Sequence, residues 1–349
     1  MTLDDIRRQD PSGMYDLLAN FPHQVEEAVT IGARSPLKLK STRIRQIMLC
    51  GLGGSAIGGD FLRSYLADDL RIPFIVNRHY TLPASVDPHT LVIISSYSGN
   101  TEETNAAHRE ARKRKARILC ISSNGNTARM ARKEKSDLIA IPGGLPPRAA
   151  LGYSFFPLLI ALQRAGFIRS QSRSIKETVQ LLHTLARRYA GPDPATNRAL
   201  ALAQELRNRV SVVYSGPERF DVVNLRWRGQ IAENAKALAF GHVIPEMNHN
   251  ELVGWNVLHD RMAEMQVVLL RDAADHKRVQ IRMDISRGIL ARHTNHISEV
   301  WSEGRSPLAR IFSLIHLGDW VSFYLAMLHG VDPTPVEVID YLKTELSKV

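Results

Sequence analysis

The sequence predicts an α/β protein with two domains, each a mostly parallel sheet flanked by helices as a three-layer sandwich. The chain has 349 residues, which is enough for two domains of ordinary size. Short apolar runs alternate with helical patterns, as in βαβ units. The order of strand, small-residue turn and helix begins twice, at Ile44 and at Val210, and indicates a weak internal duplication.

The first half is expected to hold a helical extension and one domain. In residues 1–40, apolar side chains recur three or four positions apart, which predicts an N-terminal helical extension. The first domain is expected over residues 41–170. Its predicted strands are the apolar runs 44–50, 72–76, 90–95, 117–122 and 138–141. Its predicted helices lie near 61–67, from 102 onward and from about 149.

The second half is expected to repeat this arrangement after a linker. Residues 171–198 are polar and contain GPDP, so they predict a helical linker. The second domain, with a C-terminal tail, is expected over 199–349, with strands at 210–214, 266–270 and 297–301. Ser306 and Pro307 form a helix start, and that helix is expected to reach His329.

The composition is that of a globular protein, and its positive net charge suggests an anionic partner. Apolar residues make up 44% of the chain and charged residues 23%, and the formal net charge is +10. The charge alone leaves nucleic acid, a membrane surface or a phosphorylated metabolite open as the partner. The densest basic run, residues 108–117, contains no aromatic side chains between its charges. We therefore interpret it as a solvated helix face and expect no nucleic-acid partner.

The cysteines and the apolar runs predict the cellular compartment of the protein. Cys50 and Cys120 each lie at the end of an apolar run, and buried free thiols are typical of a reducing cytosol. The N-terminus is polar, without the apolar centre of a signal peptide. No run reaches the roughly eighteen apolar residues that span a bilayer. We expect a cytoplasmic protein with no membrane segment.

A glycine-rich turn, GLGGSAIGG at residues 51–59, follows the first predicted strand. Gly53 and Gly54 would let the backbone approach a ligand, and Ser55 brings a hydroxyl to the start of a helix. The glycine spacing is not that of the dinucleotide fingerprint, and no acidic residue ends a second strand about 20 residues later. The turn therefore does not favour NAD.

A hydroxyl-rich turn, SSYSGNT at residues 95–101, lies between an apolar strand and a helix. Ser96, Ser98 and Thr101, together with helix-start amides, can hold a phosphate dianion without a lysine. An ordinary turn capped by Thr101 is the alternative. That alternative does not account for Ser96 and Ser98, so we favour a phosphate site.

Two further side chains are candidates for proton transfer. Glu233 lies on a helix with apolar neighbours and could act as a general base if it is partly desolvated. A surface pair with Lys236, three residues away, explains it equally well. His249, between two asparagines, is either a proton shuttle or an exposed loop histidine. No metal-ligand spacing is found, so we expect neither a metal nor a cofactor.

Five segments in one order carry a family resemblance: GLGGSAIGGD, SYSGNTEET, the PRA of 147–149, ENAKALAF and NHNELVGW. Together they resemble the bifunctional phosphoglucose/phosphomannose isomerases, which are built from two sugar-isomerase (SIS) domains. The resemblance extends from about residue 10 to about residue 345. SYSGNT indicates only the superfamily, whereas ENAK followed by NHNE is the narrower signal.

The resemblance implies a metal-independent aldose–ketose isomerase that connects glucose 6-phosphate and mannose 6-phosphate with fructose 6-phosphate through an enediol. It implies that Ser55, Ser96, Ser98 and Thr101 hold the phosphate, with Gly53 and Gly54 near the substrate. Arg148 would stabilise the enediolate, and Glu233 would be the base. His249 from the neighbouring subunit and Lys343 would assist ring opening. A homodimer with the active site at its interface is implied, in glycolysis and gluconeogenesis.

Three alternatives compete with this interpretation. A non-catalytic sugar-phosphate sensor would need the hydroxyl-rich turn but not Glu233 or His249. An amidotransferase-type isomerase would normally carry an N-terminal glutaminase with a leading cysteine, whereas this sequence starts Met-Thr-Leu. A DNA-binding regulator would need a helix-turn-helix within the first 40 residues. The presence of Glu233 and His249 favours the enzyme.

Overall fold

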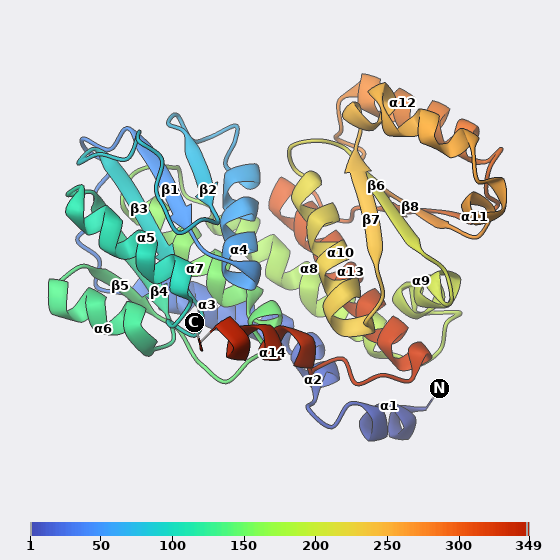
Figure 1. Ribbon diagram of the computed structural model, residues 1–349, viewed down its shortest axis with the longest axis horizontal. Helices are drawn as coiled ribbons and strands as arrows, with labels where there is room; N and C mark the ends of the chain where they lie inside the picture. The colour runs from blue at the N-terminus through green and yellow to red at the C-terminus, as the bar shows by residue number, and fades with distance from the viewer. Residues whose placement is uncertain (1, 347, 349) are drawn as a thin grey trace. The chain divides into compact units, whose positions relative to one another are not determined.

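Two parallel sheets organise the chain in the computed structural model, which describes residues 2–346 and 348 (Figure 1). Each sheet belongs to one of two units. The first unit consists of Asn20–Leu181 and Ser306–Ala309, and the second of Met1–Ala19, Leu182–Arg305 and Arg310–Val349. The two-domain α/β class predicted from the sequence is confirmed. The domain boundaries at residues 40, 170 and 198 stay predictions.

The first unit contains a five-stranded sheet in the order β2-β1-β3-β4-β5, with every pair parallel. Its strands are β1 (Gln46–Cys50), β2 (Phe74–Asn77), β3 (Thr90–Ser95), β4 (Arg117–Ser122) and β5 (Asp137–Ala140). Its helices are α3 (Phe21–Arg34), α4 (Gly53–Tyr65), α5 (Glu102–Lys113), α6 (Gly125–Glu134), the 3₁₀ turn η1 (Pro147–Ala149) and α7 (Leu151–Arg164). The chain leaves this unit within α8 (Ser172–Ala190).

Helices cover both faces of the first sheet because its strands are apolar on both sides. On one face, Met48, Val92 and Cys120 pack against alanines of α5 and α6. On the other face, α4 comes so close to Leu49 that a Cβ on Gly59 would lie 2.6 Å from that side chain. Cys50 and Cys120 are buried free thiols, as predicted, and burial raises the pKa of each to about 12.

The second unit contains a four-stranded parallel sheet in the order β7-β6-β8-β9. Its strands are β6 (Ser211–Ser215), β7 (Ala239–Val243), β8 (Gln266–Arg271) and β9 (Ile297–Trp301). Its helices are α1 (Leu3–Gln9), α2 (Met14–Ala19), α9 (Arg198–Leu206), α10 (Asp221–Ala235), η2 (Glu246–His249), η3 (Glu251–Asn256), α11 (His259–Ala263), α12 (Lys277–Leu290), α13 (Pro307–His329) and α14 (Glu337–Leu346).

The sheet of the second unit is also covered on both faces. One face packs Val212, Tyr214 and Leu269 against α12 and the turns η2 and η3. On α10, the Asn224 amide donates to the carbonyl oxygens of Val213 and His242, at 2.8 and 3.0 Å, which fixes that helix against β6 and β7. The two sheets share one strand order, with β6 in the position of β1 and β8 in that of β3. The predicted internal duplication is thus seen in the order of the strands in the two sheets.

Helix α13 is more apolar over its length than the search for uninterrupted apolar runs indicated. It begins and ends as predicted, and Ser306 Oγ caps it by accepting from the amide of Ala309 at 3.3 Å. It is also long and apolar enough to cross a membrane by length and composition, with a mean hydropathy of 1.5. However, 94% of that window is buried inside the protein. Within the described residues it therefore has the burial of a core helix.

Candidate active site

The glycine-rich turn brings two backbone segments of the first unit together. Gly53 has a φ of +49°, in the region that favours glycine, and starts α4. A Cβ on Gly54 would lie 2.5 Å from the carbonyl oxygen of Pro147, so glycine is needed for η1 to approach. This approach places Arg148, which is 4% exposed, next to the start of α4. The close contact at Gly54 is thus between two segments of the first unit, and the predicted approach to a ligand stays a prediction.

Ser55 is buried where the turns after β1 and β3 meet. Its Oγ accepts a hydrogen bond from the Tyr97 amide at 3.0 Å, and its carbonyl oxygen accepts one from Ser95 Oγ at 3.1 Å. A hydroxyl that accepts one bond still has its own proton to donate. Ser55 therefore holds the second turn in place.

The segment Ser96–Thr101, here named the phosphate loop, has its hydroxyls at the N-terminus of α5. Ser96 Oγ lies 3.0 Å from Thr101 Oγ1 and accepts from the Gly99 amide at 3.1 Å. Thr101 occupies the N-cap of α5, but its side chain makes no capping bond. Ser98 is exposed, and its Oγ accepts from the Asn100 amide at 3.3 Å. The first-turn amides of α5 are thus placed to meet an anion.

A neighbouring turn fixes the phosphate loop. Gly99 has a φ of +74°, and a Cβ there would lie 1.8 Å from the carbonyl oxygen of Asn124. The Gly99 carbonyl accepts from the Thr127 amide at 2.9 Å, and the Tyr97 carbonyl accepts from Ser123 Oγ at 2.7 Å. The sequence predicted the strand that ends at residue 122, but it did not predict this support from the turn that follows. The polar turn after a strand was the only available signal.

The buried side of this region has little free space. A cavity of about 10 Å³, about one water molecule in size, is lined by Ser55, Tyr97, Pro147 and their neighbours. Burial raises the pKa of Tyr97, so its hydroxyl stays protonated and accepts from the Leu145 amide at 3.0 Å. A sugar does not fit in that cavity.

Glu233 lies in the last turn of α10 in the second unit and is half-buried. The Lys236 ammonium group donates to the backbone carbonyls of Glu233 and Pro335, each at 2.6 Å, and to that of Pro333 at 3.2 Å. Lys236 itself ends the helix in a left-handed conformation, with a φ of 56°. These backbone contacts fix the end of α10 that carries Glu233.

Buried polar contacts hold α10 against α13. Asp319 accepts from Arg226 through two hydrogen bonds of 3.0 and 2.8 Å and from Gln230 at 2.9 Å. Asn234, next to Glu233, donates to Ser322 Oγ at 2.9 Å. Both side chains of the Arg226–Asp319 pair are 4% exposed. Sequence reasoning missed this anchor, although an aspartate in an otherwise apolar helix was a usable signal.

His249 and Lys343 lie on two further elements of the second unit. His249 ends η2 and is exposed. Lys343 is on α14, where its side chain is 70% exposed and its Nζ lies 3.5 Å from Asp340 Oδ1. The segment that the sequence suggested was a tail is therefore helical at residues 337–346. The predicted phosphate ligands and Arg148 share the first unit, whereas Glu233, His249 and Lys343 belong to the second.

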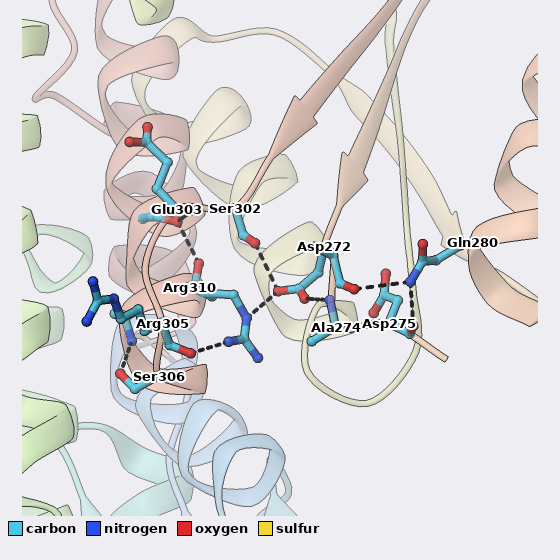
Figure 2. A network of polar contacts seen from close by, with 12 residues as sticks. Asp272, Ala274, Asp275, Gln280, Ser302, Glu303, Arg305, Ser306 and Arg310 are labelled. Carbon is cyan, nitrogen blue, oxygen red and sulfur yellow. Dashed lines mark hydrogen bonds and ion pairs between the residues drawn. The ribbon is translucent and has the colours of Figure 1, made fainter. Parts of the chain in front are cut away.

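In the second unit, the loop after β8 occupies the topological position of the phosphate loop, and it is acidic (Figure 2). Asp272 Oδ2 accepts from Arg310 Nε and from Ser302 Oγ, both at 2.9 Å. The Asp275 carboxylate lies about 3.0 Å from where a Cβ on Gly216 would be. Two carboxylates in this position disfavour a phosphate dianion.

Asp275 makes the stability of the protein depend on pH. Burial and the charge of Asp272 raise the pKa of its carboxyl from 3.8 to about 6, against the opposing charges of Arg271 and Arg219. The stability that this group contributes is therefore complete below about pH 4 and is lost as the pH rises through about 6. We expect the free energy of unfolding of Asp275→Asn, which stays neutral, to exceed that of the parent by about 1–2 kcal/mol at pH 8.

Urea unfolding of both proteins at pH 4 and pH 8 measures this difference. At pH 4 the gap between variant and parent should nearly vanish. An equal gap at both values would mean that the ionisation of Asp275 is not its cause.

Two families match separate parts of the chain. The family described as "SIS domain" matches residues 42–143, and the family described as "Bacterial phospho-glucose isomerase C-terminal SIS domain" matches residues 195–346. These segments contain β1 to β5 and β6 to β9. The prediction of two SIS domains is thereby confirmed.

Solved structures share the fold at low sequence identity. A hypothetical protein from Thermus thermophilus aligns with a TM-score of 0.75 and 16% identity, covering 98% of this chain and 91% of that one. A structure described as a putative phosphosugar isomerase from Clostridium difficile 630 aligns with a TM-score of 0.73 and 17% identity, covering 95% and 97%. At these identities the likeness establishes the fold alone.

Curated relatives are similar over nearly the whole length. The bifunctional phosphoglucose/phosphomannose isomerase of Caldicellulosiruptor bescii is 44% identical over 96% of this chain and 99% of its own. That of Aquifex aeolicus is 37% identical over 88% and 92%. With its two SIS domains and this degree of similarity, the chain belongs to the bifunctional phosphoglucose/phosphomannose isomerase family.

Proposed function

We propose that this protein interconverts glucose 6-phosphate and mannose 6-phosphate with fructose 6-phosphate, in the cytoplasm and without a metal ion. The proposal is supported by the family of the chain and, in the structure, by the phosphate loop. Ser96 and Thr101 place hydroxyls beside the N-terminus of α5, where Thr101 makes no side-chain cap. Phosphate bound there fixes the non-reacting end of the sugar, so that binding energy orients the reacting carbons.

The proposed reaction is a proton transfer between C1 and C2. His249 and Lys343 assist the opening of the sugar ring. Glu233 removes the C2 proton of the aldose, and the O2 proton moves to O1 as the enediolate reorganises. Glu233 then returns its proton to C1 and leaves the ketose. Arg148 lowers the energy of the enediolate as a fixed cationic donor.

One enediol serves both aldoses, because glucose 6-phosphate and mannose 6-phosphate differ only in the configuration at C2. A base that reaches C2 of either epimer gives the same intermediate. Two activities therefore need only one set of residues, with room around C2 for both hydroxyl positions.

Incubation with fructose 6-phosphate, with and without EDTA, tests the proposed function. We expect both aldose 6-phosphates to form. The rate for each should be the same with EDTA as without it. Loss of activity in EDTA that zinc or magnesium restores would overturn metal independence. Binding of fructose 6-phosphate without conversion would instead support a sugar-phosphate sensor.

We further propose a homodimer in which His249 completes the active site of the neighbouring subunit. Mixing Glu233→Gln and His249→Asn proteins after subunit exchange is then expected to restore activity. One active site of each mixed dimer has both residues, so a 1:1 mixture should reach about a quarter of the parent activity. If His249 serves its own subunit, the mixture would stay as inactive as the separate variants.

A further inference from the structure

The chain between β7 and α11 holds His249 between two buried apolar anchors. Met247 is fully buried and Trp255 is 3% exposed, and both belong to the core cluster that contains Tyr214. His249 lies between these anchors in the sequence and is exposed. This loop, residues 245–256, is thus anchored by Met247 and Trp255 and exposes an imidazole between them.

A chain of hydrogen bonds connects the core to this loop. Trp255 Nε1 donates to the Tyr214 hydroxyl at 3.1 Å, and that hydroxyl donates to Glu251 Oε1 at 2.5 Å. Burial raises the pKa of Tyr214, so its proton stays in place as the donor. The Tyr214 hydroxyl therefore has a fixed direction toward Glu251, two residues beyond His249.

The charge of Glu251 also acts on a side chain of α10. Arg228, on α10, is half-buried, and burial lowers the pKa of its guanidinium. The negative charge of Glu251 opposes that shift. The negative charge of Glu251 thus offsets part of the cost of burying the Arg228 guanidinium. A neutral residue at position 251 would remove this stabilisation.

The residues on both sides of His249 are held as well. Asn248 Nδ2 donates to Ser286 Oγ on α12 at 2.7 Å, and Ser286 is 2% exposed. Asn250 Oδ1 accepts from the Glu251 amide at 2.5 Å, and its Nδ2 donates to Glu246 Oε1 at 3.0 Å. The backbone that carries the imidazole is therefore restrained before and after it.

We propose that Tyr214, Glu251 and Trp255, here named the loop clamp, are positioning residues for His249. The proposal rests on the role proposed above for His249 in ring opening. The clamp touches no reacting atom. It fixes the direction of the imidazole, and ring opening needs that direction because proton transfer requires the donor within hydrogen-bond reach of the ring oxygen.

A double-mutant cycle between Tyr214→Phe and His249→Asn tests the clamp. Tyr214→Phe keeps the ring and removes only the hydroxyl. We expect it to lower kcat/KM for glucose 6-phosphate about tenfold in the parent and less than twofold in the His249→Asn background. Glu251→Gln should behave in the same way, and it serves as the second variant if Tyr214→Phe folds poorly.

Tyr324→Phe is the matched control. It removes a buried tyrosine hydroxyl of the same unit, which donates to the Tyr189 carbonyl at 2.6 Å. It should lower stability while leaving kcat/KM within twofold of the parent. A Tyr214→Phe effect of equal size in both backgrounds would show a structural role and overturn the clamp. The clamp would also be overturned if Tyr214→Phe left kcat/KM unchanged while His249→Asn lowered it. In both cases the proposed function would stand.

Full activity of His249→Asn would instead remove the proposed role of His249, and with it that of the clamp. Such a result would leave Glu233 and the phosphate loop as the remaining parts of the proposed function.

Discussion

Glu233→Gln is expected to lower kcat about 10²–10⁴-fold, which is the range that a positioned general base contributes. Glutamine keeps the shape of the side chain but cannot take a proton from C2. The KM for fructose 6-phosphate should change little, because the proposed phosphate contacts lie in another part of the chain. A coupled assay in both directions measures the two parameters. Glu264→Gln, an exposed site, is the control and should retain parent activity.

Proton exchange gives this prediction a second readout. In deuterated water the parent should incorporate deuterium at C1 of fructose 6-phosphate and C2 of the aldoses, and Glu233→Gln should not. Full activity or unchanged exchange in Glu233→Gln would remove the assignment of the base. In contrast, Ser96→Ala should weaken substrate binding while exchange continues in the bound substrate.

Asp319→Ala is expected to lower the free energy of unfolding by about 3–5 kcal/mol, the cost of leaving one partner of a buried ion pair without the other. Arg226 would keep its charge in a site where it is 4% exposed. Gln230 would also lose its acceptor. Chemical denaturation monitored by tryptophan fluorescence measures the loss, since Trp227 and Trp320 are buried in this unit.

Glu303→Ala is the matched control for this pair. Glu303 Oε1 bonds Arg188 Nη1 at 2.7 Å, but the two side chains are 40% and 42% exposed. Its removal should cost less than about 1 kcal/mol, because solvent screens exposed charges. If the two variants lose similar stability, the buried pair does not anchor α10 as we argue.

The sheet was largely predictable because its central strands are apolar on both faces. The predicted strands 90–95 and 117–122 coincide with the central strands β3 and β4. The predicted strand 297–301 coincides with β9, an edge strand that was visible by its alternation of buried and partly exposed residues. Strand β7 was missed, since AFGHV contains a glycine and a histidine and lies at a sheet edge with only partial burial. Helix α4 was placed too late because its first residues are glycines. Gly54 allows the close approach of Pro147, and Gly59, later in the helix, allows that of Leu49.

The candidate residues that lie in one continuous segment could be predicted from the sequence. The contacts between distant residues that hold the site in place could not. The phosphate loop is a continuous segment, so the hydroxyls of Ser96 and Thr101 were visible as a pattern. Asp319 lies 93 positions from Arg226, and Tyr214 lies 37 positions from Glu251. No periodicity relates such pairs. They come together only when the sheet and its covering helices form.

The most direct test of the account is a crystal structure of the protein with fructose 6-phosphate bound. We expect phosphate oxygens within hydrogen-bond distance of the Ser96 and Thr101 hydroxyls. The Glu233 carboxylate should lie about 3 Å from C1 or C2 of the same sugar. A sugar bound by the phosphate loop with Glu233 remote from it, in every pairing of subunits, would contradict the account.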